Sequence, residues 1–212
     1  MDELIIQKRD ELITPELIKR MHHMVGEGLG EAFRATPGEL RRSNVYVGDY
    51  RPPSYDEVES LVSRLCEWLD HEFHFQRGQD FAIAVVESIV AHVYLEWIHP
   101  FGDGNGRTGR LLEFYILMRS GLPNIASHLL SNHYNLTRAE YYRQISDAAS
   151  ANDLSAFIAY AMRGLRDGLQ TPAFSRATYR YRRGGSCEGC RFTFNACCTL
   201  AMSDQDRGEG MP

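Results

Sequence analysis

Apolar residues recur every three or four positions along most of the chain, the spacing of helices that bury one face. The first such stripe follows Thr14-Pro15, a pair typical of an N-cap and a first helical turn, and it stops at Gly26. Its apolar members are Ile13, Leu17, Met21, Met24 and Val25. We expect a first helix here.

Two capping boxes predict where later helices begin. In Ser54-Tyr55-Asp56-Glu57 and in Thr137-Arg138-Ala139-Glu140, a hydroxyl and a carboxylate three residues apart can satisfy each other's backbone N–H groups. Helical apolar patterns follow both, over 58–69 and 141–149. A last helix over 154–165 can be started by Asp153.

Residues 81–98 form the most apolar stretch of the chain. Their number suits a membrane span, but bilayer hydrocarbon would penalise Glu87, His92 and Glu96 within it. We therefore expect a buried central helix that ends just before His99. Another helix, over 111–118, is stopped by Gly121.

One short segment has β character. Val45 and Val47 alternate with polar neighbours, Gly48-Asp49 supplies a turn, and Pro52-Pro53 prevents further strand pairing. The fold predicted is thus an all-α helical bundle with one small β-hairpin.

The composition is that of an ordinary globular domain, with 212 residues, 43% hydrophobic and 24% charged. A net charge of -5 gives no general attraction to nucleic acid or to an anionic membrane, and we expect neither as a partner. The charged N-terminus does not resemble an export signal. Only Cys66 lies outside the C-terminal tail, so we expect no disulfide framework and a reducing cytoplasm.

Helical periodicity stops near Gln170. We expect one domain over 1–169, with its core over about 14–169, and a disordered tail over 170–212 that is rich in Cys, Arg and Gly. Cys187, Cys190 and Cys197-Cys198 could bind zinc, and the arginines and tyrosines of 176–183 could bind single-stranded nucleic acid. For both patterns we favour an unstructured, solvated arm.

Candidate chemistry is concentrated in the twelve residues His99-Pro-Phe-Gly-Asp-Gly-Asn-Gly-Arg-Thr-Gly-Arg110. Histidine accepts protons near neutral pH, and a carboxylate such as Asp103 suits Mg2+. Glycine-rich backbone at a helix start can wrap a phosphate, and arginines can neutralise its charge. The loop therefore contains the groups needed for phosphate transfer.

A different chemistry is also conceivable. His92, Glu96 and His99 fall on one helical face, as the ligands of a catalytic zinc might. Pro100 and the lack of a fourth ligand weaken this interpretation. We expect His92 to be a hydrogen-bonded core residue.

The twelve residues match the signature His-x-Phe-x-(Asp/Glu)-Gly-Asn-Gly-Arg-x-x-Arg, and over 14–169 the chain resembles Fic-domain proteins. The segment Gly38 to Pro53 and Ala91-His92 are also similar to that family. The resemblance implies a protein adenylyltransferase that moves AMP from ATP to a Ser, Thr or Tyr hydroxyl of another protein or of itself, with Mg2+. The alternatives are transfer of UMP, phosphocholine or a phosphoryl group, or an inactive interaction module.

By the same resemblance, His99 would deprotonate the target hydroxyl and Asp103 would hold Mg2+. Residues 45–50 would be a flap, along which a target protein binds by strand addition. Tyr141 and Tyr142 could lie near the base, although helix packing explains both. The nucleotide-binding residues implied are Phe101, Gly102, Gly104, Asn105, Gly106, Arg107, Arg110, Tyr141 and Tyr142.

Many Fic proteins carry an inhibitory motif, (Ser/Thr)-x-x-x-Glu-(Gly/Asn), whose Glu pairs with the second signature arginine, here Arg110. The three Glu-Gly pairs of this chain begin at Glu27, Glu188 and Glu209, and none has Ser or Thr four residues earlier. We therefore expect Arg110 to be unblocked in cis, with Glu27 as the least implausible internal substitute. The isolated protein would then be active, or be restrained by a separate, antitoxin-like protein.

Overall fold

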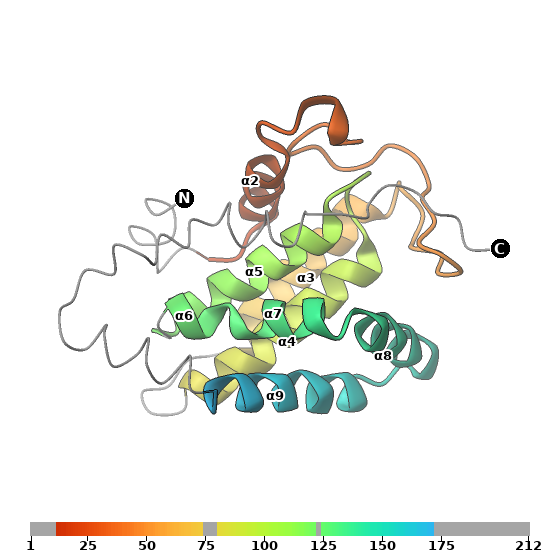
Figure 1. Ribbon diagram of the computed structural model, residues 1–212. Helices are drawn as coiled ribbons and strands as arrows, with labels where there is room; N and C mark the ends of the chain where they lie inside the picture. Colours follow the sequence, from red (N-terminus) through yellow and green to blue (C-terminus); the bar gives the residue numbers. More distant parts are fainter. Residues whose placement is uncertain (1–11, 74–79, 122–123, 172–212) are drawn as a thin grey trace.

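The computed structural model describes residues 12–73, 80–121 and 124–171, and within these ranges the fold is helical (Figure 1). Predictions for the tail beyond residue 171 lie outside the described residues. The elements are α2 (Pro15–Gly26), the 3-10 helix η1 (Gly30–Ala32), α3 (Val58–Glu72), α4 (Asp80–Ile98), α5 (Asn105–Arg119), α6 (Asn124–Ser127), α7 (Leu129–Leu136), α8 (Arg138–Ala151) and α9 (Ser155–Leu169). The all-α prediction is confirmed.

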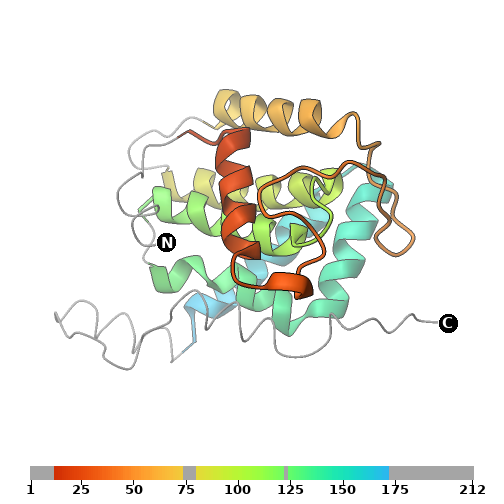
Figure 2. The same ribbon diagram turned by 90° about the horizontal axis from the view of Figure 1, so that it is seen from above.

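Helices α4 and α5 pack against each other at the centre of the molecule. Helices α2 and α3 cover one side of this pair, and α7, α8 and α9 cover the other. Figure 2 shows α2 crossing over α5. The loop between α4 and α5 holds the signature residues, so the central pair determines where the candidate site lies.

Helix α4 is buried on both sides. Ala91 and Leu95 belong to the hydrophobic cluster shared with α2, α3 and α5, whereas Ile89 and Val93 belong to the cluster shared with α7, α8 and α9. The segment Phe81–Ile98 is long and apolar enough to cross a membrane, yet 61% of it is buried inside the protein. Packing between two clusters accounts for its hydrophobicity, as the prediction of a central helix required.

Local capping signals had mixed outcomes. The Thr14 prediction is confirmed, because its hydroxyl accepts a hydrogen bond from the Leu17 N–H at 3.2 Å. The Asp153 carboxylate likewise accepts from the Ser155 N–H at 2.8 Å. Neither capping box forms its side-chain hydrogen bonds, although α8 begins at Arg138, directly after Thr137, as predicted. Helix α3 begins only at Val58, after a turn, and the Thr137 hydroxyl bonds backward to the carbonyl of His133 at 2.7 Å.

The predicted hairpin is reduced to one antiparallel bridge between Val47 and Tyr50. The turn forms as expected, with Gly48 at φ +57°. The short helices α6 and α7 were not predicted, because their few apolar residues make no continuous stripe. Helix α7 packs closely on α9, where a side chain at Gly164 would overlap the His133 ring.

Candidate active site

His99 is the first residue after α4 and has a left-handed backbone. Its N–H still donates to the Leu95 carbonyl at 2.9 Å, but φ is +49° and Pro100 turns the chain out of the helix. The imidazole Nδ1 lies 3.3 Å from the Glu96 carbonyl oxygen. A carbonyl can only accept, so this contact places the proton on Nδ1 and leaves a lone pair on Nε2.

The surroundings of His99 favour a neutral imidazole. Burial lowers its pKa below 6.5, and the positive charge of Arg41 lowers it further. The Glu96 carbonyl and the Asp103 carboxylate oppose this without reversing it. At neutral pH the ring is therefore unprotonated at Nε2 and can accept a proton.

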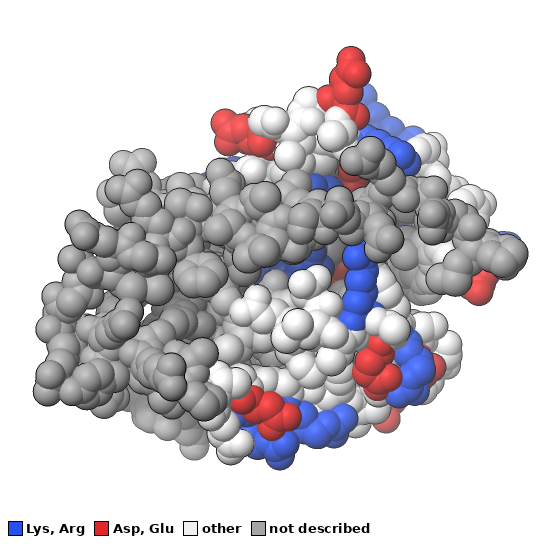
Figure 3. Space-filling model, in the orientation of Figure 1, with Lys and Arg blue, Asp and Glu red and all other residues white. Residues whose placement is uncertain are grey.

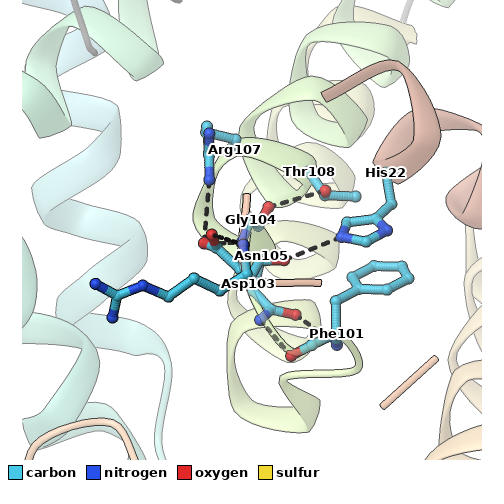
Figure 4. Close-up of polar contacts among 8 residues, drawn as sticks. His22, Phe101, Asp103, Gly104, Asn105, Arg107 and Thr108 are labelled. Atoms are coloured by element: carbon cyan, nitrogen blue, oxygen red, sulfur yellow. Dashed lines mark hydrogen bonds and ion pairs between the residues drawn. The ribbon is translucent and has the colours of Figure 1, made fainter. Parts of the chain in front are cut away.

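Asp103 is held by donors from three residues. Its Oδ2 accepts from the Arg34 N–H at 3.1 Å, and its Oδ1 accepts from the Gly104 N–H and from Arg107 Nη2 at 3.1 Å. Figure 4 shows the Gly104 backbone and Arg107 converging on this carboxylate. A carboxylate offers about four lone-pair positions, so three bonds leave room for a further ligand.

Helix α5 begins with an uncapped N-terminus. Gly104 precedes it at φ +77°, and a side chain at that position would lie 2.8 Å from the Phe33 ring, so only glycine fits. No side chain caps the helix. The backbone N–H groups of Asn105, Gly106 and Arg107 lack partners within the helix and form an anion-binding position.

The Asn105 side chain builds the loop instead of facing a ligand. Its Oδ1 accepts from the Phe101 N–H and its Nδ2 donates to the Phe101 carbonyl, both at 2.9 Å. Asn105 and the Phe101 ring are buried. A nucleotide could therefore meet these two residues only through backbone atoms, whereas Gly102 is exposed.

The two signature arginines differ in their surroundings. Arg107 forms an ion pair with Asp103, and its guanidinium carbon lies 5.2 Å from the centroid of the Phe33 ring. No hydrogen bond or ion pair joins Arg110 to another described residue, and a side chain at Gly106 would lie 3.3 Å from its Nη1. Glu27 is exposed, and no hydrogen bond or ion pair joins it to Arg110 within the described ranges. Arg110 is the arginine available to an anionic ligand.

A buried polar layer lies beneath Arg110. His92 Nε2 is 3.0 Å from the Tyr141 hydroxyl, and the Tyr134 hydroxyl donates to Glu113 at 2.9 Å. Burial lowers the pKa of His92 to about 3 and raises that of Glu113 to about 8. Among the described residues no three metal-ligating side chains come together, so the structure does not support the zinc alternative.

The two tyrosines of α8 point to different environments. Tyr141 is buried and bonded to His92, as helix packing predicted. Tyr142 is 51% exposed, with the Arg138 guanidinium 5.7 Å from its ring centroid. Of the two, only Tyr142 presents its ring to solvent.

Three further residues hold the site and were not identified from the sequence. His22 Nε2 donates to the Asp103 carbonyl at 3.0 Å and its Nδ1 accepts from the Gly38 N–H at 2.9 Å. Arg34 supports Asp103 through its backbone, and Arg41 bonds to the carbonyl of His99 at 2.8 Å. Of these three residues, only His22 could have been suspected from the sequence, because it lies among the buried positions of α2.

Comparison with known proteins agrees with this geometry. Protein adenylyltransferase fic-1 of Caenorhabditis elegans is 33% identical over 168 residues, which cover 79% of this chain and 30% of that protein. Protein adenylyltransferase Fic of Nematostella vectensis is 29% identical over 163 residues, covering 77% and 34% respectively. The chain thus spans about a third of the length of these curated relatives.

Solved structures show the same fold. Fic-1 (residues 134 to 508) of C. elegans superposes with a TM-score of 0.59 at 27% identity, covering 80% of this chain and 45% of that one. A Fic family protein from Desulfovibrio desulfuricans gives 0.59 at 24% identity, covering 79% and 48%. The model of the Fic/DOC family matches residues 12–117, half of the chain and all twelve signature residues, so this chain belongs to the Fic/DOC family.

Proposed function

We propose that this chain is a protein adenylyltransferase that moves AMP from ATP to a protein hydroxyl. The proposal depends on one observation. The imidazole of His99, with its Nε2 free, lies in the loop that leads to the uncapped N-terminus of α5 and to the available arginine, Arg110. The relatives named protein adenylyltransferase support the choice of AMP. The proposal concerns the described domain, since the relatives are much longer.

His99 acts as the general base. A hydroxyl is a weak nucleophile until its proton is removed, and Nε2 is the acceptor that the Nδ1 contact leaves free. The hydroxyl oxygen bonds to the α-phosphorus, the bond from that phosphorus to pyrophosphate breaks, and the hydroxyl proton passes to His99. General-base catalysis of this kind contributes roughly 10²- to 10⁴-fold.

The start of α5 binds the phosphates. Negative charge accumulates on the transferred group and on the pyrophosphate, and fixed donors stabilise it without reorganisation. The N–H groups of residues 105–107 and the Arg110 guanidinium supply such donors. Tyr142 is the exposed aromatic residue of α8 on which a base could stack.

The carboxylate of Asp103 fits Mg2+. It is partly exposed, retains an acceptor position, and lies beside the anion-binding helix start. Mg2+ typically takes one or two carboxylates together with phosphates and waters. When bound, it supplies positive charge to the phosphate oxygens. Arg107 and the Gly104 N–H fix the orientation of the carboxylate that would hold it.

A target segment would pair with the flap at residues 45–50. Tyr46 is 71% exposed and Val47 is exposed as well, so an apolar edge is open to a partner strand. On the face that Figure 3 shows, acidic and basic side chains of the described residues lie side by side. We also propose a cytoplasmic location, and a separate protein as the restraint on Arg110.

Labelled ATP tests the reaction. The chain is incubated with Mg2+ and ATP labelled at the α- or the γ-phosphate, with a cell extract as the source of targets. Protein-bound label from the α position alone supports AMP transfer. Label from the γ position alone indicates phosphorylation, and no label from ATP, UTP or a phosphocholine donor indicates an interaction module. Either of the last two results overturns the proposal.

A further inference from the structure

A single buried guanidinium joins the His99 loop to the base of the flap. Arg41 is only 6% exposed. Its Nε donates to the His99 carbonyl at 2.8 Å, and its backbone N–H donates to the Pro100 carbonyl at 2.9 Å. Arg41 therefore fixes the two residues at which the chain leaves α4.

The rest of the same guanidinium holds both ends of the flap. Nη1 donates to the Ser43 carbonyl at 3.0 Å, and Nη2 donates to the Pro53 carbonyl at 2.5 Å. Ser43 and Pro53 flank the flap on its N-terminal and C-terminal sides. One planar group thus binds carbonyls from three points of the chain.

The flap has little structure of its own to keep it in place. Its strands are reduced to the Val47–Tyr50 bridge, which cannot define the position of the loop relative to α4. In a second link, the Tyr50 hydroxyl donates a hydrogen bond of 2.9 Å to the carbonyl of Trp97, two residues before His99. Both links, through Arg41 and through Tyr50, connect the flap to the end of α4 that is followed by His99.

Arg41 lacks the usual partner of a buried charge. No carboxylate lies within ion-pair distance of it among the described residues, although buried arginines are commonly paired with acids. Its side-chain hydrogen bonds all go to backbone carbonyls. Such a set of bonds needs the planar fork of arginine, since lysine has one nitrogen and cannot span the same acceptors.

We propose that Arg41 is a positioning residue, which sets the distance between the flap and His99 so that a target hydroxyl carried on the flap reaches the imidazole. This inference rests on the proposed function. It assigns Arg41 to alignment of the protein substrate, not to ATP binding, because none of its bonds goes to α5 or Asp103.

The test compares Arg41→Lys with Arg42→Lys, a control at an exposed neighbouring arginine. Each variant receives α-labelled ATP, and AMP on protein is measured beside AMP released to water. For Arg41→Lys, the ratio of protein-bound to free AMP should fall by roughly tenfold, since small misplacements of reacting groups are costly. ATP affinity, measured by calorimetry, should remain within about twofold, and Arg42→Lys should change neither quantity.

A role confined to stability would lower both products in proportion and would overturn the proposal, as would an unchanged ratio. If the wild-type protein transfers nothing from ATP, the proposed function fails, and hydrogen exchange then decides the role of Arg41. Faster amide exchange over residues 43–53 in Arg41→Lys would support the link to the flap, and unchanged exchange would contradict it. Loss of a cooperative thermal transition in both Arg41→Lys and Arg41→Gln would make Arg41 a core residue and would also contradict the proposal.

Discussion

The imidazole of His22 stacks on the ring of Phe101, with 3.7 Å between the ring centroids and 4° between their planes. Figure 4 shows the same imidazole reaching the Asp103 backbone. Burial lowers the pKa of His22, so it is neutral, with the Nε2 proton directed at the Asp103 carbonyl. Through His22, helix α2 therefore stabilises the signature loop, although α2 contains none of the signature residues.

His22→Phe tests this support. The variant can retain the stacking but loses the bonds to Asp103 and Gly38, which leaves a partly buried carbonyl and N–H without partners. We expect a loss of about 1–3 kcal/mol in the free energy of unfolding, and slower AMP transfer, because Asp103 is less fixed. Chemical denaturation and the labelled-ATP assay measure the two effects. His23→Phe, at the exposed neighbour, is the control, and equal effects of both variants would contradict the assignment.

The pH dependence of transfer tests the base. His99 has a pKa below 6.5 because it is buried, and only the unprotonated ring can take the hydroxyl proton. The rate should therefore be independent of this group at pH 7 to 8 and should fall as the pH drops through a value below 6.5. Initial rates at constant ionic strength give this midpoint. A midpoint above 6.5 would show that burial does not govern the imidazole.

Gly104 and Gly28 make a matched pair for the loop geometry. Their φ angles are +77° and +78°, but a side chain at Gly104 would meet Phe33, whereas nothing lies within 4 Å of one at Gly28. Backbone strain is then common to both alanine variants. Gly104→Ala should be less stable than Gly28→Ala by about 1–3 kcal/mol from overpacking, and should bind ATP more weakly. Equal stability in urea denaturation would rule out the steric explanation.

Buried Glu113 makes folding sensitive to alkaline pH. Burial raises its pKa to about 8 from an ordinary 4.5, so between these values the folded protein binds a proton that the unfolded chain releases. Stability should thus decrease as the pH rises from 6.5 to 8.5. Glu113→Gln retains an acceptor for Tyr134 and should be more stable than wild type at pH 8.5 by about 1–2 kcal/mol.

The control for that variant is Glu59→Gln, on the exposed face of α3. Denaturation at pH 6.5 and 8.5 compares the three proteins. His92, whose lowered pKa destabilises the fold only as the pH falls below 6.5, does not contribute in this range. Burial also raises the pKa values of Glu87 and Glu96 to about 7, so the measure of Glu113 is the stability difference between wild type and Glu113→Gln. If that difference is the same at both pH values, Glu113 is ionised in the fold.

Features set by neighbouring residues were predictable from the sequence. The Thr14 cap spans three residues, and the glycine turn at Gly48 needs only its own backbone. The capping box at Thr137 failed because tertiary structure competes for its hydroxyl, which also contacts the Tyr160 hydroxyl of α9 at 2.5 Å.

The residues that hold the site in place could not be predicted from the sequence, because they too depend on tertiary contacts. His22 contacts Asp103 across 81 positions, and Arg41 contacts His99 across 58. Such pairs carry no local spacing pattern. The reacting groups themselves were predictable because twelve consecutive residues contain them. The residues that hold this loop in place, such as His22 and Arg41, become apparent only in the folded structure.

The most direct measurement is tandem mass spectrometry of modified protein after incubation with ATP and Mg2+, comparing the wild-type chain with His99→Ala. We expect AMP on a Ser, Thr or Tyr side chain with the wild-type chain, and none above background with His99→Ala, whose Asp103 and α5 N-terminus are intact. AMP at equal levels in both samples, or a phosphoryl group in place of AMP, would contradict transfer of AMP to a hydroxyl activated by His99.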